Sequence, residues 1–293
     1  MKRLTAIILT AVIFFALAIS VTAHDAVTTA AYGAPDAIDG IRDKAWDKAE
    51  KIFVGDLSGA DVGDEISTAD VWTLWDGKYL YIFAEIKDKT VDADVEKKDP
   101  GAFWDQDALG IMINYDYSTV NTGKDTSYRG LGEKNFAGYT NVPAVKGDVH
   151  SREKDTIMEL DRYHNEIKTY CVITDKGWNV EARMPLAVYK EFKPGDKIGF
   201  ELCLNNSIGK GSRASQTVWK QKDGAKGADS WTNPSNFGTL ILGMPPVETT
   251  AAAAAAGTAA PAQAAQTADI TLAAAAICGI LSLAGVTLRR RRG

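Results

Sequence analysis

The sequence predicts an all-β protein, built as an antiparallel β-sandwich. Apolar residues alternate with polar or aromatic ones over short segments, and turns rich in Gly, Asp, Asn and Pro separate these segments. Helical periodicity is scarce between the two ends of the chain. The 293 residues are 45% hydrophobic and 24% charged, a composition that excludes a wholly disordered or collagen-like protein.

The N-terminus reads as a secretory signal. Met-Lys-Arg precedes an apolar run over residues 7–19, and residues 21–23 (Val-Thr-Ala) offer the small side chains that a signal peptidase accepts. We therefore predict a signal peptide over residues 1–23, with a retained N-terminal anchor as the alternative. The domain that folds is predicted over residues 28–244.

The C-terminus predicts a membrane anchor. Residues 245–269 are rich in Ala and Thr and serve as a linker, and residues 270–288 form an uncharged apolar span. The basic tail over residues 289–293 contains four arginines, which stop translocation and stay in the cytoplasm. The order of Gln266-Thr267-Ala268-Asp269, apolar span and basic tail resembles a sortase-read sorting signal. The expected location is therefore outside the cell, anchored to the membrane or wall of a Gram-positive bacterium.

The clearest strands form a hairpin over residues 71–86. Its two apolar and aromatic runs are joined by Asp76-Gly77, a dipeptide that suits a type I′ turn. After this turn, one face carries apolar residues at every second position from Leu80 to Ile86, which predicts a strand with one buried face.

Further strands follow the same reasoning. Leu109, Ile111 and Ile113 alternate with other side chains, and a second hairpin is predicted from residues 170–174 and 178–184 around Asp175-Lys176-Gly177. Strands are also expected over residues 197–205, 216–220 and 239–242. The polar stretch over residues 121–155 is predicted to be a long loop that binds a ligand or moves.

Charge and motifs narrow the functional classes. The formal net charge is −5, although six of the cations lie at the two ends, so the domain does not attract nucleic acid. The sequence holds no phosphate-binding glycine loop, no histidine pair at helical spacing and no Gly-x-Ser-x-Gly elbow. Three cysteines allow at most one bridge in the domain, between Cys171 and Cys203. We therefore expect a protein that is not an enzyme.

An acidic segment carries the candidate metal ligands. Asp88, Asp92 and Asp94 lie in a turn-rich segment with hard oxygen donors, which suits calcium. A solvated acidic loop and a catalytic carboxylate pair remain as alternatives. No haem is expected, because nothing in the sequence requires an axial ligand pair.

Tryptophan is the most informative residue type, with seven copies. Five of them lie in apolar patterns and are interpreted as core residues: Trp46, Trp72, Trp75, Trp178 and Trp219. Trp104 and Trp231 instead stand in polar loops. Indoles in such places suit stacking on pyranose rings, so these two residues are the predicted platform for a sugar.

Four separated motifs resemble carbohydrate-binding module family 9. They are the entry at residues 31–40, the hairpin at residues 74–81, Trp104-Asp105-Gln106-Asp107, and the closing segment at residues 231–238. The resemblance implies a jelly-roll or DOMON-like β-sandwich that binds sugars without catalysis, often beside plant-polysaccharide hydrolases and with bound calcium.

The resemblance also implies the site residues. Trp104 and Trp231 occupy the positions of the two stacking indoles, and Arg129 and Asp107 complete the predicted sugar-binding set. Gly110 stands where the family has a carboxylate, and a cysteine replaces a strand amide at position 203. The expected partner is a poly- or oligosaccharide of the glucan or xylan type. A surface adhesin or scaffold component and an accessory domain of a glycoside-hydrolase system remain as alternative functions.

Overall fold

The computed structural model describes residues 26–93, 103–120, 137–150, 165–187, 190–209, 212–220 and 233–246. The chain divides into two compact units, Met1–Val247 and Glu248–Gly293. The predicted signal peptide, membrane span and basic tail lie outside the described residues, as does the predicted linker after residue 246. Within the described part, no helix is both long enough and apolar enough to cross a bilayer.

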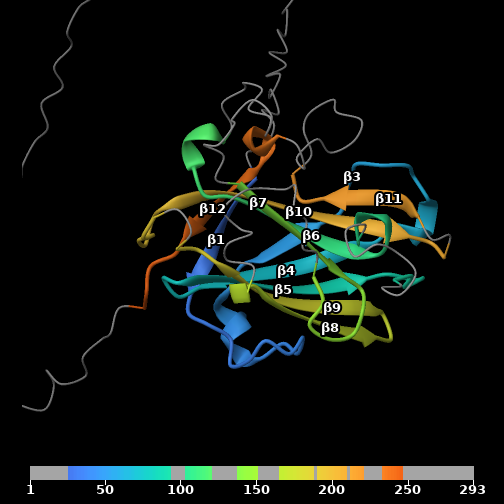
Figure 1. The fold of residues 1–293 in the computed structure, drawn as a ribbon, viewed down its shortest axis with the longest axis horizontal. Helices are drawn as coiled ribbons and strands as arrows, with labels where there is room; N and C mark the ends of the chain where they lie inside the picture. Colours follow the sequence, from blue (N-terminus) through green and yellow to red (C-terminus); the bar gives the residue numbers. More distant parts are fainter. Residues whose placement is uncertain are drawn as a thin grey trace, which may run out of the picture. The chain divides into compact units, whose positions relative to one another are not determined.

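Twelve β-strands form the described part of the first unit, and they make two layers joined by one strand (Figure 1). Sheet A contains β3 (Asp56–Leu57), β6 (Ala108–Asn114), β7 (Ala137–Pro143), β10 (Lys197–Ser207), β11 (Arg213–Val218) and β12 (Gly238–Leu242). Sheet B contains β2 (Lys51–Val54), β4 (Thr68–Trp75), β5 (Tyr79–Lys87), β8 (Lys168–Thr174) and β9 (Gly177–Pro185).

Strand β1 (Val27–Tyr32) connects the two sheets. Its first four residues pair with β12, and Ala31 and Tyr32 pair with β4, in both cases in parallel. The remaining strand pairs are antiparallel. The described residues contain no α-helix, and their short 3-10 segments include η1 (Lys44–Lys48), η2 (Gly63–Glu65), η3 (Phe103–Asp105), η4 (Tyr117–Thr119) and η7 (Pro234–Asn236). The predicted all-β class is confirmed.

Both predicted hairpins are present. Strands β4 and β5 join through Asp76-Gly77-Lys78, where Gly77 has a φ of 93° that a side chain would disfavour. The side chain of Asp76 accepts hydrogen bonds from the backbone N–H groups of Lys78 and Tyr79, at 2.9 and 2.8 Å. Strands β8 and β9 form the second hairpin, around residues 175–176. The turn residues therefore fixed both registers.

Three parts of the fold differ from the sequence prediction. The polar stretch over residues 121–155 contains strand β7, which pairs along its whole length with β6. Strand β11 begins at Arg213 and ends at Val218, several residues before the predicted position. Strands β1 and β2 were not predicted at all. These strands are short or polar, so their pairing partners rather than their own patterns define them.

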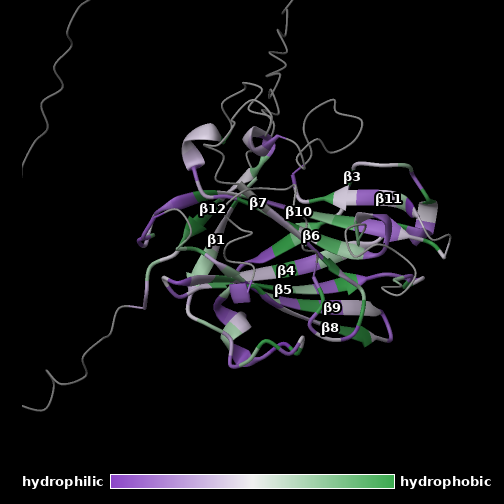
Figure 2. Cartoon of the chain, in the orientation of Figure 1, coloured by the Kyte–Doolittle hydropathy of each residue, from purple (hydrophilic) through white to green (hydrophobic). Residues whose placement is uncertain are grey.

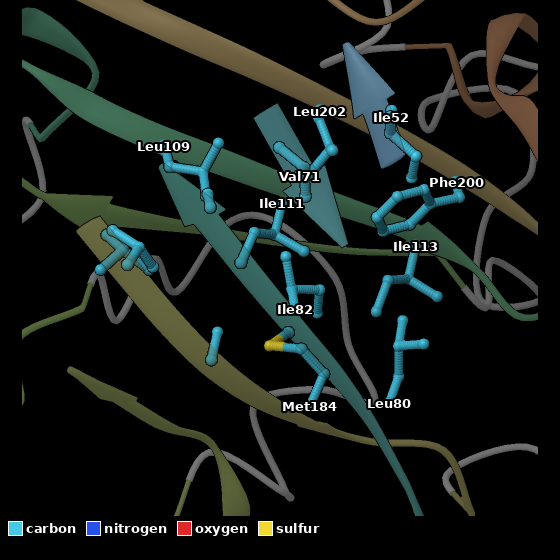
Figure 3. Close-up of a cluster of buried hydrophobic side chains, with 14 of the residues drawn as sticks. Ile52, Val71, Leu80, Ile82, Leu109, Ile111, Ile113, Met184, Phe200 and Leu202 are labelled. Carbon is cyan, nitrogen blue, oxygen red and sulfur yellow. The ribbon is translucent and has the colours of Figure 1, made fainter. Parts of the chain in front are cut away.

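The core lies between the two sheets. Figure 3 shows side chains of β6 and β10 from sheet A facing those of β2, β4, β5 and β9 from sheet B. The labelled contributors are Leu109, Ile111, Ile113, Phe200 and Leu202 on one side and Ile52, Val71, Leu80, Ile82 and Met184 on the other. Because side chains alternate along each strand, every second residue points to the face of the sheet that lies away from this core.

Most of the predicted core tryptophans are buried. Trp46, Trp75 and Trp178 are at most 1% exposed, whereas Trp72 and Trp219 are half-buried and pack against the edges of hydrophobic clusters. The two cysteines of the domain, Cys171 and Cys203, are free and buried. The bridge that the sequence allowed is therefore absent.

Candidate functional site

The outer face of sheet A is the side of β6, β7, β10 and β11 that points away from the core. Along β10, Phe200, Leu202 and Leu204 belong to the core. Cys203 belongs instead to a separate small cluster with Met112, Val218, Phe237 and the half-buried Tyr139. Because side chains alternate along a strand, the residues in register with Cys203 share this outer face. Four strands thus present side chains to one surface.

Trp104 lies beside strands β6, β7 and β10 of sheet A. It belongs to the short turn η3, whose neighbour Phe103 is 3% exposed, whereas Trp104 is 38% exposed. The turn η3 packs against β6, β7 and β10. Since Phe103 anchors the turn in the protein, the indole is held in place while part of its surface faces solvent. The other predicted site residues, Trp231 and Arg129, lie outside the described residues.

A chain of hydrogen-bonded amides crosses the outer face of sheet A. The buried Asn205 accepts hydrogen bonds from the guanidinium of Arg213 and the amide of Gln216, at 3.0 and 2.9 Å. The side-chain nitrogen of Asn205 donates to the side-chain oxygen of Asn141 at 3.3 Å. The side-chain nitrogen of Asn141 in turn donates to the hydroxyl of Tyr139. We call these five residues the amide network.

A glycine lets the amide network cross strand β6. Asn205 and Asn141 lie on the strands to either side of β6, where Ala108 and Gly110 leave little or no side chain between them. A Cβ atom at Gly110 would lie 2.5 Å from Cys203 Sγ and 3.3 Å from Asn141 Oδ1. The missing side chain at position 110 is therefore required by the close packing of its neighbours.

The amide network was not predicted from the sequence. Asn205 and Gln216 lay within predicted strands, where alternation alone cannot separate a buried amide from a solvated one. Asn141 fell inside the segment predicted to be a loop, and Arg213 lay before the predicted start of its strand. The sequence signal that could have revealed the network is an amide side chain, Asn205, in a strand that is otherwise apolar, because a buried amide needs hydrogen-bond partners.

Asp107 differs from its predicted role as a sugar contact. Its side chain is completely buried, and it accepts a hydrogen bond from the backbone N–H of Ser207 at 2.6 Å and another from the backbone N–H of Asp92. The carboxylate therefore joins the end of β10 to the segment after β5. Asp107 positions the strand ends below Trp104 and is not exposed to a ligand.

Two of the three predicted metal ligands are described. Asp88 is 9% exposed and accepts hydrogen bonds from the backbone N–H of Thr90 and from Trp178 Nε1, at 3.1 and 3.3 Å. Asp92 is half-buried and accepts from the hydroxyl of Ser207 at 2.6 Å. Asp94 lies outside the described residues.

The acidic segment brings two buried carboxyl groups together. Burial and the nearby charge of Asp88 raise the pKa of Asp107 to about 8, and burial also raises the pKa of Asp88. In the described ranges, no three side chains of His, Cys, Asp or Glu are grouped so that they could hold a metal ion. The described part thus contributes a carboxyl pair rather than a complete ligand set.

Glu201 is a third buried acid, on the outer face of sheet A. Its Oε1 atom accepts hydrogen bonds from the backbone N–H groups of Leu202, Trp219 and Lys220, at 3.0 to 3.1 Å. Burial raises the pKa of Glu201 to about 8 although these three donors oppose the shift. The carboxyl group therefore fixes the chain where it leaves strand β11.

Comparison with known proteins identifies the family. The sequence profile described as "Carbohydrate family 9 binding domain-like" matches residues 38–244. The chain belongs to this family. The match covers most of the domain between the two predicted terminal segments, and the family is a non-catalytic carbohydrate-binding module.

Curated relatives in this family are large enzymes. The chain is 28% identical over 220 residues to endo-1,4-beta-xylanase A of Thermoanaerobacterium saccharolyticum, covering 74% of this chain and 16% of the enzyme. It is 30% identical over 222 residues to endo-1,4-beta-xylanase A of Thermotoga maritima, covering 74% of this chain and 18% of the enzyme. The chain therefore corresponds to less than a fifth of the length of these relatives.

Solved structures support the fold. A family 9 carbohydrate-binding module from Caldicellulosiruptor kristjanssonii, solved with cellotriose, superposes with a TM-score of 0.57 at 21% identity, covering 76% of this chain and 97% of that module. The same type of module solved with glucose gives a TM-score of 0.57 at 22% identity, covering 77% and 100%. These neighbours place the chain among family 9 β-sandwiches. The DOMON-like relationship stays a prediction.

Proposed function

We propose that this domain binds poly- or oligosaccharides of the glucan or xylan type on the outer face of sheet A, without catalysis. The observation that carries the proposal is the partly exposed indole of Trp104, which the turn η3 holds beside strands β6, β7 and β10 of sheet A. Trp231 is proposed as the second stacking residue and Arg129 as a further contact. The structural neighbours were solved in complex with cellotriose and with glucose, which supports this class of partner.

The affinity of one domain is expected to be modest. An aromatic stack contributes about 0.5–1.5 kcal/mol beyond the area that it buries. Many copies on one surface would then hold a polymer through avidity. Because the curated relatives are xylanases, the proposed context is an accessory role in the breakdown of plant polysaccharides.

Replacing the indole tests the proposal directly. In Trp104→Ala, retention on an affinity gel that contains xylan or glucan should fall at least tenfold, while the thermal unfolding midpoint stays close to that of the wild type. The matched control is Phe53→Ala, because Phe53 is a 57% exposed aromatic residue on sheet B. Equal retention of wild type and Trp104→Ala would contradict the proposed site.

The proposed location is the surface of a Gram-positive cell. Residues 1–23 would direct export, residues 270–288 would enter the membrane, and a sortase would act near Thr267. Deleting residues 270–293 should release the domain into the medium, measured by immunoblotting of cells and culture fluid. Replacing Thr267 with Ala separates wall attachment, which it would abolish, from membrane attachment, which it would leave intact.

Calcium is proposed as a structural ion near Asp88, Asp92 and Asp94. The buried carboxyl pair of Asp88 and Asp107 fits a hard cation, because burial raises the pKa of both groups, the charge of Asp88 raises that of Asp107 further, and a cation would oppose these effects. When bound, the ion would stabilise the segment that leads to Trp104. A chelator should lower the unfolding midpoint of the wild type, and Asp88→Asn should remove this sensitivity.

A further inference from the structure

Arg213 is an unpaired cation on the outer face of sheet A. It is exposed, and within the ranges that the structure describes its guanidinium forms no ion pair. Its one hydrogen bond goes to Oδ1 of Asn205, a residue that is 2% exposed. A buried acceptor therefore fixes one edge of the guanidinium, and most of its N–H donors remain for another partner.

A β-bulge brings Arg213 to this face. Strict alternation from Gln216 would turn Arg213 toward the core, because the two residues are three positions apart. The register shifts after Asn206, so that Arg213 pairs with Ser207, and its guanidinium reaches Asn205 on the outer face. Bulges commonly re-aim one side chain in this way. The arginine is thus placed by the backbone and not by free rotation in solvent.

The neighbouring groups are also donors. Asn205 Oδ1 accepts from both Arg213 and Gln216, so this oxygen has no capacity left for a ligand. Position 110, in the centre of the face, is a glycine and offers no carboxylate to neutralise the arginine. Strand β11, which carries both donors, is coloured mainly hydrophilic in Figure 2. Around Asn205, the side chains of Arg213 and Gln216 therefore offer donors and a positive charge.

Arg213 and Trp104 both lie near the β6–β10 strand pair of sheet A. Asn205 pairs with Ala108, and Trp104 precedes Ala108 by four residues. Even a fully extended chain would separate the Cα atoms of Trp104 and Ala108 by no more than about 14 Å.

We propose that this face prefers glycans that carry a carboxylate, such as xylan substituted with uronic acid, with Arg213 as the group that binds the carboxylate. The proposal rests on the sugar-binding function proposed above and adds a charge preference to it. A carboxylate matches the fork of a guanidinium in two parallel hydrogen bonds, whereas a neutral hydroxyl does not. The net negative charge of the domain repels an acidic glycan, but this repulsion acts over a longer range than the contact with Arg213. Salt screens it beyond about 8 Å at physiological concentration.

The test compares two ligands of equal length, a neutral xylooligosaccharide and one that carries a single glucuronic acid. Titration calorimetry at low salt should show the acidic ligand binding to the wild type about tenfold more tightly, as expected for one charge-assisted contact. The preference should shrink when the salt concentration is raised. In Arg213→Gln the two ligands should bind equally, because the acidic ligand loses its charged contact, and Arg213→Lys should retain part of the preference.

The controls distinguish this inference from the proposed function. Arg42→Gln removes an exposed cation on sheet B and should leave both affinities unchanged. Trp104→Ala should lower the affinity for both ligands by the same factor. Equal binding of both ligands to the wild type, or an equal loss of both in Arg213→Gln, would overturn the charge preference but leave sugar binding intact. Absence of binding to either ligand would overturn the proposed function as well.

Discussion

The outer faces of the two sheets both carry aromatic side chains but use them differently. On sheet B, the segment over residues 36–49 covers the aromatic residues, and the buried Trp46 packs on Phe83 with ring centroids 5.6 Å apart. On sheet A, Trp104 remains partly exposed beside the amide network. The comparison shows that aromatic content alone does not locate a sugar site, because the protein itself can occupy an aromatic surface.

Cations of the protein complete the cover on sheet B. The guanidinium of Arg42 lies 4.8 Å from the ring centroid of Trp72, and Arg183 and Lys78 lie 4.3 and 4.9 Å from that of Tyr79. These rings already have the partners that a ligand would otherwise provide. The cation Arg213 on sheet A has no aromatic or carboxylate partner in the described structure. A ligand is therefore expected on sheet A and not on sheet B.

The largest expected effect comes from the covered aromatic cluster. Trp46→Ala should lower the free energy of unfolding by about 3–5 kcal/mol, because it leaves a large cavity beneath the segment over residues 36–49. Chemical denaturation measures this loss. Sugar affinity, measured on the folded fraction, should not change. A large loss of affinity at unchanged stability would mean that sheet B contributes to the site.

The second effect concerns the glycine at the centre of sheet A. Gly110→Ala should cost about 1–3 kcal/mol of stability, because the new methyl group overlaps Cys203 Sγ. The double variant Gly110→Ala, Cys203→Ala removes the overlapping atom and should recover most of that loss in thermal denaturation. Failure of the second substitution to recover stability would mean that another contact, such as that with Asn141, is limiting.

The third effect is a dependence of stability on pH through Glu201. Its pKa is about 8 in the folded state and about 4.5 when unfolded, so the folded protein binds the proton more tightly. Stability is therefore greatest below about pH 4.5 for this group and falls as pH rises toward 8, by up to about 1.4 kcal/mol per pH unit. Glu201→Gln keeps the acceptor oxygen and should flatten this slope.

Unfolding midpoints from pH 5 to 8 measure the slope for wild type and Glu201→Gln. Glu85→Gln, at a half-buried position on the outer face of sheet B, is the control and should keep the slope of the wild type. Parallel slopes for all three proteins would show that another group carries the pH dependence.

The smallest effect tests the cover on sheet B. Arg42→Ala should lower stability by about 0.5–1 kcal/mol through loss of the contact with Trp72. It should also increase the fluorescence quenching of tryptophan by iodide, since the ring becomes more exposed. No change in quenching would indicate that residues 36–49 alone shield the ring.

The sequence by itself determined the class of fold and the main hairpins. Alternation along residues 80–86 and 109–113 requires one buried face, and Asp76-Gly77 specifies a turn, so both features follow from local chemistry. The exposed indole of Trp104 was also predictable, because a large apolar side chain in a polar loop indicates a function. The four family motifs were also recognisable from the sequence, because each consists of residues that are adjacent in the chain.

Only the tertiary structure decided what surrounds Trp104. The amide network joins residues from β7, β10 and β11 that are far apart in the sequence, and a bulge after Asn206 turns Arg213 to the outer face. The burial of Asp107 likewise depends on Ser207, a hundred residues further along the chain. Local patterns report which face a residue takes within its own strand. They do not report which strands become neighbours, and hydrogen bonds between strands depend on that.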